Sequence, residues 1–188
     1  MSQSKVWPNA LKFWRRPGEV LLALFETQSG QSLAFLVAAL FGLVQALPVY
    51  LKASSPAVLL LLAGPLLGLV GIYFFSWLLR NFSRWFGGTA TLSQVRTALG
   101  LGLSPWTLLF YLMLPLQHTL QSEATLTQFY FLFFGFLVYG YVILLLSLSA
   151  ALQLSPLKTF LCMTVTILVS LFPLSLLGQL LLSGFAGL

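Results

Sequence analysis

Long apolar runs alternate with short polar stretches along most of this chain, and this pattern predicts membrane-spanning helices. A helix needs roughly 20 residues to cross the hydrocarbon of a bilayer, and each run is close to that length. Away from their ends the runs contain no charged residue, so nothing opposes their insertion. The predicted spans cover residues 32–51, 57–79, 98–116, 128–152 and 159–182. We therefore expect an all-α fold, a polytopic helical bundle with five transmembrane helices.

The segment before the first span, residues 1–31, follows a different pattern. Basic and aromatic residues are interleaved in it, and Pro17 with Glu19 marks a plausible helix start. The apolar run that follows, residues 20–25, is too short to span. We interpret this segment as a helix lying in the cytoplasmic interface, anchored by tryptophan and basic side chains. A solvated, partly ordered tail is the alternative.

The polar stretches between the runs predict how the helices are joined. Residues 52–56 and 153–158 are so short that the spans they connect must be antiparallel neighbours. Residues 117–127 form a polar loop. In the longer stretch 80–96, Gly87-Gly88 is expected to end one helix, and Thr91 or Ser93 to cap the next.

Composition agrees with this interpretation. Hydrophobic residues make up 59% of the 188 residues and charged residues only 6%, with a mean hydropathy of +0.98. A typical soluble domain is about 25% charged, so the hydrophobic excess must face lipid. The net charge of +6 does not indicate nucleic-acid binding, because the basic residues lie at the ends of apolar runs and form no continuous patch.

The distribution of basic residues predicts the orientation. If the loops alternate between the two sides, one side holds eight basic residues and the other holds Lys52 alone. By the positive-inside rule the rich side is cytoplasmic. The N-terminus is then cytoplasmic and the C-terminus periplasmic, in a multi-pass protein of the cell inner membrane. The eight residues are Lys5, Lys12, Arg15, Arg16, Arg80, Arg84, Arg96 and Lys158.

Few residues are suited to catalysis or metal binding. The chain has no aspartate, its only carboxylate side chains are Glu19, Glu26 and Glu123, and its only histidine is His118. His118 and Glu123 share a loop, where we interpret both as solvated residues. The single cysteine, Cys162, lies in an apolar run and is interpreted as a packing residue. We therefore predict no enzyme activity, no catalytic residues, no cofactor and no metal site.

Binding residues are predicted instead at the cytoplasmic face and at one intramembrane position. Gln45 lies about two-thirds of the way along the first span, and its amide needs a partner within the hydrocarbon. It is expected either to bond to another helix or to line a polar cavity. The candidate contacts to anionic headgroups or to a protein partner are Arg15, Arg16, Arg80, Arg84, Arg96, Trp14 and Trp85.

Small residues recur at helical spacing and favour close contacts between helices. Ala34 and Ala38 form one such pair, and Gly64 and Gly68 form another. Packing within one chain is favoured, and homodimerisation is the alternative. Prolines in or near the spans predict bent helices and internal crevices. They are Pro48, Pro65, Pro105, Pro115 and Pro173.

Two stretches resemble the Yip family, membrane proteins first known as partners of Ypt/Rab GTPases. They are WFGGTATLSQVRTALGLGLSPWTLLF (85–110) and VYGYVILLLSLSAALQLSPLKTFLCMTV (138–165). The Gly-Gly pair, the polar helix start and the Ser-Pro at 104–105 are typical of bacterial members. The resemblance implies five spans and a cytoplasmic N-terminus. The Asp-Leu-Tyr-Gly-Pro motif of eukaryotic members is absent, since the chain has no aspartate.

These observations favour a non-enzymatic inner-membrane protein of the Yip family that acts through protein partners or lipids, in membrane organisation or as a scaffold. Expected partners are anionic lipid headgroups at the cytoplasmic face, a membrane protein or a second copy of the chain. A small-molecule-binding or substrate-capture subunit of a transporter complex is the alternative. A cavity beside Gln45 would favour that alternative, and a closed bundle would count against it.

Overall fold

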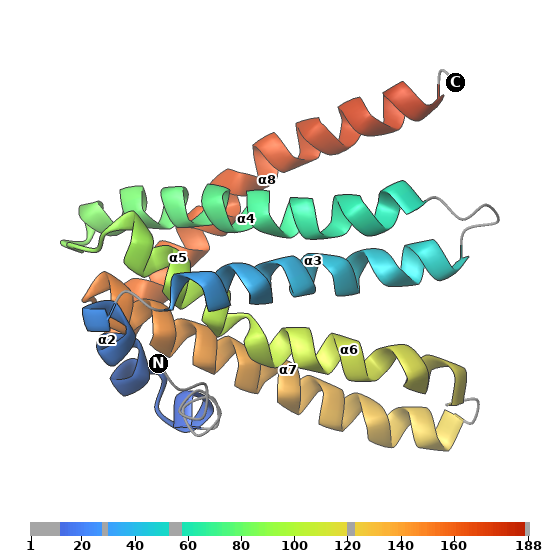
Figure 1. Ribbon diagram of the computed structural model, residues 1–188, viewed down its shortest axis with the longest axis horizontal. Helices are drawn as coiled ribbons and strands as arrows, with labels where there is room; N and C mark the ends of the chain where they lie inside the picture. Colours follow the sequence, from blue (N-terminus) through green and yellow to red (C-terminus); the bar gives the residue numbers. More distant parts are fainter. Residues whose placement is uncertain (1–11, 28–29, 53–57, 120–122, 187–188) are drawn as a thin grey trace.

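The computed structural model describes residues 12–27, 30–52, 58–119 and 123–186 (Figure 1). Within these ranges the chain forms helices and no strands, which confirms the predicted all-α class. Residues 12–15 are also helical and lie ahead of the helix that begins at Pro17. The helices are α2 (Pro17–Thr27), α3 (Gln31–Lys52), α4 (Val58–Trp85), α5 (Leu92–Gly102), α6 (Ser104–Thr119), α7 (Glu123–Leu152) and α8 (Pro156–Ala186).

Five stretches of the described residues are long and apolar enough to cross a membrane, which confirms the predicted number of spans. The chain is therefore a multi-pass membrane protein. The helices α3, α4, α6 and α7 run side by side, and α2 lies across one end of them (Figure 1). The five stretches are Gln31–Leu51, Leu61–Trp85, Leu92–Pro115, Phe129–Leu152 and Pro156–Pro173.

The two ends of the bundle differ in charge. The helices α3, α5 and α8 begin at the end on the left of Figure 1, where α4 and α7 finish. This end, called the basic end below, carries Arg84, Arg96 and Lys158. At the opposite, far end lies Lys52, the last residue of α3. The predicted alternation of connecting segments is thus reproduced by the fold.

The helix α4 continues to Trp85, beyond the predicted end of the span at residue 79. It stops where Gly87 adopts a positive φ of 90°, a conformation that favours glycine. The Gly88 amide then donates to the Ser83 carbonyl at 2.8 Å, and the Gly87 amide to the Arg84 carbonyl at 3.1 Å. This glycine-based cap confirms the predicted stop. Hydropathy located the edge of the hydrocarbon and not the end of the helix.

The next helix, α5, begins at Leu92, six residues before the predicted span. Thr91 accepts a hydrogen bond from the Gln94 amide at 3.3 Å, and Gln94 Oε1 accepts one from the Thr91 amide at 2.9 Å. This reciprocal pair satisfies amides that the first helical turn leaves unbonded. Of the two predicted caps, Thr91 is therefore the one used.

The predicted third span is not one helix but two. The helices α5 and α6 are interrupted at Leu103, whose amide bonds to the carbonyls of Leu99 and Gly100 at 3.1 and 3.2 Å. Pro105 follows as the second residue of α6, and it has no amide to continue the ladder. The break therefore lies where the Ser-Pro pair predicted a bend. Other predicted loop residues are helical, since α6 reaches Thr119 and α7 begins at Glu123.

Glycines hold α3 and α4 in close contact. A methyl group on Gly42 would lie 2.1 Å from the Gly64 carbonyl oxygen, and one on Gly68 would lie 2.2 Å from the Ala38 carbonyl oxygen. A methyl group on Gly100 of α5 would lie 2.6 Å from the Ala34 carbonyl oxygen. The predicted small-residue pairs thus pack within one chain, as the favoured interpretation expected.

The helix α2 packs against the basic end of the bundle, mainly on α7. Leu21 is fully buried, and Val20 is buried beside it. Ahead of α2, the Trp14 indole donates to Ser104 Oγ at 3.1 Å, and the Tyr139 hydroxyl donates to the Trp14 carbonyl at 2.7 Å. The helix predicted from Pro17 and Glu19 is present, and it is held by protein contacts. Its place in the membrane interface stays a prediction.

Candidate functional site

An apolar groove of about 620 Å³ lies between the helices, and residues from every span line it. We call this cavity the groove below. The helices α3 and α4 supply one wall, with Gly42 and Phe75 among its residues. The break at Leu103, α7 and the first part of α8 supply the rest, with Leu148 and Met163 among their residues.

The groove exists because α8 diverges from the bundle and because α4 has glycines, which have no side chain, on the wall of the groove. Past its contact with α4, the second half of α8 diverges from the bundle (Figure 1). On the wall facing the groove, α4 presents Gly64, Gly68 and Gly71 in succession. A methyl group added to Gly71 would meet nothing within 4 Å, so this glycine borders open space. The predicted internal crevice is therefore present.

The lining is almost entirely hydrocarbon. Four lining side chains carry a polar atom, namely Gln45, Trp106, Tyr141 and Thr166. Two of them are already bonded: the Trp106 indole donates to the Leu137 carbonyl at 3.0 Å, and the Thr166 hydroxyl to the Cys162 carbonyl at 2.8 Å. No charged residue is among the lining residues that the structure describes. Such a lining is suited to apolar molecules.

Gln45 is placed in the groove, and no hydrogen bond joins its amide to another described residue. Its side chain is exposed. The predicted bond to a neighbouring helix is therefore not found in the described part of the chain. Gln45 thus borders a cavity, but this cavity is apolar, whereas the sequence predicted a polar one. Its role as an intramembrane polar contact stays a prediction.

Several hydroxyl groups inside the spans bond to their own helices, whereas the buried Ser147 hydroxyl has no hydrogen-bond partner among the described residues. Ser76 donates to the Ile72 carbonyl, and Thr107 donates to the Leu103 carbonyl at 3.0 Å. Thr164 and Ser170 follow the same pattern on α8. Within the groove, the amide of Gln45 and the hydroxyl of Tyr141 form no hydrogen bond with another described residue. Both therefore remain available to a ligand.

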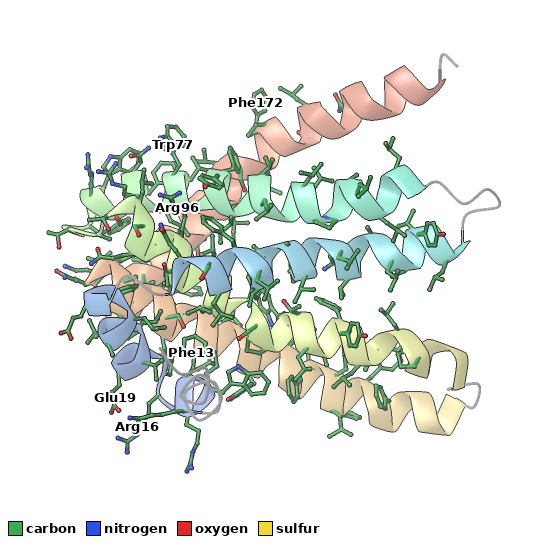
Figure 2. The ribbon with its side chains drawn as sticks, in the orientation of Figure 1. Phe13, Arg16, Glu19, Trp77, Arg96 and Phe172 are labelled. Atoms are coloured by element: carbon green, nitrogen blue, oxygen red, sulfur yellow. The ribbon has the colours of Figure 1, made fainter. Side chains whose placement is uncertain are left out.

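The predicted basic contacts form two separate groups. Arg16 and Arg96 lie on different sides of the bundle (Figure 2). Arg16 pairs with Glu19 at 3.0 Å, and both side chains are well exposed, so this ion pair adds little stability. Arg15 is exposed nearby. Trp14, predicted as a headgroup contact, instead donates its indole N–H to Ser104 and is half-buried.

The second basic group lies at the end of α4 and the start of α5. The Arg96 guanidinium lies 4.8 Å from the centre of the Tyr73 ring, and Tyr73 stacks on Phe35 at 5.6 Å. Trp77 is exposed one turn after Tyr73 (Figure 2). This arrangement places a cation beside aromatic rings near the start of α5.

Three further predicted contacts lie on α4 in this second group. Arg84 and Trp85 are exposed at the end of the helix, where Trp85 packs edge-on against Phe82. Arg80 is half-buried, and its Nε has no hydrogen-bond partner among the described atoms. Arg84 and Trp85 are therefore the most accessible of the predicted headgroup contacts in this group, whereas Arg80 and Arg96 are both half-buried.

Sequence reasoning expected a crevice in general terms, from the prolines, but it missed the position of the groove and most of its lining. The signal was present in the glycines at 64, 68 and 71, which were assigned to packing alone. It missed Trp106, which bridges α6 and α7 and fits against Gly140. The side chains of His118 and Glu123 lie outside the described part of the chain. No group of three potential metal ligands occurs among the described residues.

Comparison of the chain with protein-family models, with curated proteins and with solved structures found no match. The resemblance to the Yip family therefore rests on the residues quoted above and stays a hypothesis. The fold and the groove are the observations from which a function can be argued.

Proposed function

We propose that this protein is a non-enzymatic membrane protein that binds a lipid-like molecule in its intramembrane groove. The observation that carries the proposal is the apolar cavity of about 620 Å³, lined by all five spans. Ligand sites are typically concave, mostly apolar and about 300–1,000 Å³ in volume. The size and chemistry of this groove fall within that description.

Its position in the fold supports a lipid as the occupant. The groove lies within the spans, so hydrocarbon and not water surrounds it. The divergence of α8 from α4 gives lipid a lateral route to the lining (Figure 1). Water gains nothing from an apolar lining, whereas an acyl or isoprenoid chain makes dispersion contacts along it.

The orientation is part of the proposal. The basic end carries Arg15, Arg84, Arg96 and Lys158, and Lys52 lies at the far end. The positive-inside rule then places the basic end and the N-terminus in the cytoplasm, in the inner membrane. Arg84, Arg96 and Trp85 would contact anionic headgroups there. A bacterial Yip-type protein with five spans and this orientation is the family assignment we propose.

The groove also favours a second candidate function, a substrate-capture subunit of a transporter complex. A cavity beside Gln45 is the feature that this alternative predicts. A stably co-purified membrane partner with an ATPase would support it. Purification of the chain without a protein partner but with bound lipid would support the lipid-binding role instead.

Filling the groove is expected to displace its occupant. A Cβ atom added at Gly71 would meet nothing within 4 Å, so a leucine side chain there would begin in open space beside the groove. Gly135 is the matched control, because it is exposed on α7, also has open space around it and does not line the groove. In Gly71→Leu we expect about one-tenth of the wild-type amount of bound lipid per protein. This amount is measured by mass spectrometry after gentle detergent extraction. Gly135→Leu should retain the wild-type amount. Equal lipid content in the two variants would contradict the proposal.

A further inference from the structure

The groove contains a polar group that hydrocarbon cannot satisfy. The amide of Gln45 is exposed, lines the cavity and bonds to no other described residue. An unpaired amide in an apolar medium costs free energy until it finds a donor or acceptor. The methylene groups of a lipid chain supply neither. A molecule that fills this groove best therefore carries its own hydrogen-bonding group.

The depth of Gln45 limits which group that can be. With a rise of about 1.5 Å per residue, Gln45 lies about 10 Å along α3 from Lys52 at the far end. In hydrocarbon about 30 Å thick, this position is inside the core and away from the headgroups. A lipid that binds Gln45 must place its polar group at that depth. Moving an ionic headgroup into the hydrocarbon costs free energy, so an ionic group is disfavoured there.

The charge of the lining leads to the same conclusion. None of the described lining residues is charged, so a phosphate or an ammonium group would have no counter-charge there. Aromatic side chains are present instead, with Phe41 one turn from Gln45 on α3 and Phe75, Trp106 and Tyr141 on other helices. A neutral polar group and an apolar body match these residues.

We propose that the groove binds an uncharged lipid whose carbonyl or hydroxyl group hydrogen-bonds to the Gln45 side chain. The inference rests on the proposed lipid-binding function and adds the chemical class of the lipid. An isoprenoid quinone and a diacylglycerol share this chemistry. A phospholipid with an ionic headgroup does not.

The test uses the full chain, purified in detergent, with three probes: a short-chain ubiquinone, dioctanoylglycerol and dioctanoyl phosphatidylglycerol. Binding is measured by native mass spectrometry for the wild type, Gln45→Leu, Gly71→Leu and Gly135→Leu. We expect at least one neutral probe to bind the wild type and Gly135→Leu. Gln45→Leu should bind it about tenfold more weakly, because the hydrogen bond is lost while the apolar lining is kept.

The outcomes separate this inference from the proposed function. If Gly71→Leu abolishes neutral-probe binding and Gln45→Leu does not weaken it, the groove is a lipid site and the inference is wrong. If the wild type binds only phosphatidylglycerol, the inference is also overturned. If Gly71→Leu and Gly135→Leu bind every probe equally well, the proposed function fails as well. Binding of ubiquinone alone, or of the diacylglycerol alone, supports the inference and identifies the source of the neutral group.

Discussion

Replacing Gly42 with alanine is expected to disrupt the pairing of α3 with α4. The added methyl group would lie 2.1 Å from the Gly64 carbonyl oxygen and 2.9 Å from the Gly68 nitrogen. These are backbone atoms, so no side-chain rotation relieves the overlap and the two helices must separate. Overpacking a well-packed core commonly costs about 1–3 kcal/mol and occasionally more. Because this clash is with backbone, we expect a loss of at least about 3 kcal/mol.

The measurement is the free energy of unfolding of the purified protein, from titration with a denaturing detergent. Gly135→Ala is the control, since its methyl group would meet nothing within 4 Å. It should leave stability unchanged or slightly raised, because alanine favours a helix over glycine. If Gly42→Ala and Gly135→Ala were equally stable, the close approach of α3 and α4 would be wrong.

Replacing Leu21 with aspartate is expected to release α2 from the bundle. Leu21 is fully buried, so the substitution places a carboxylate in an apolar contact. An uncompensated buried charge costs about 3–5 kcal/mol, which a helix of 11 residues cannot balance with its remaining contacts. The spans themselves are unchanged and should stay inserted. The expected result is loss of amide-exchange protection in residues 17–27, measured by hydrogen–deuterium exchange in lipid nanodiscs.

The neighbouring residue provides a control for this experiment. Leu22 is 54% exposed, so Leu22→Asp adds the same charge without placing it in the core. Protection of α2 should survive in that variant. The comparison also decides what holds α2 in place. Equal loss of protection in both variants would mean that the membrane interface holds the helix, as the sequence alone predicted, and not the bundle.

The number of spans could be predicted from the sequence because insertion depends mainly on the local sum of residue hydrophobicities. The helix junction at 86–91 could also be predicted, since the cap at Gly87 and the cap at Thr91 involve only nearby residues. The exact end of α4 could not be predicted from the sequence. Residues 80–85 are polar enough to leave the hydrocarbon and still continue the helix.

The groove depends on contacts between distant parts of the chain, so local patterns did not reveal it. Gly64, Gly68 and Gly71 look alike in sequence, yet the first two contact α3 and the third borders open space. The sequence did identify Gln45 as a polar group within the first span that needs a partner. The partner expected on another helix is absent from the described residues.

The central claim, that lipid occupies the groove, can be tested directly at Trp106. This residue lines the groove, and replacing Trp7, Trp14, Trp77 and Trp85 with phenylalanine leaves it as the sole tryptophan. Lipids with brominated acyl chains quench tryptophan fluorescence on contact. In bilayers of such lipids we predict strong quenching of Trp106, and loss of most of that quenching when Gly71→Leu is added. Weak quenching in the parent protein, or equal quenching with and without Gly71→Leu, would contradict the account.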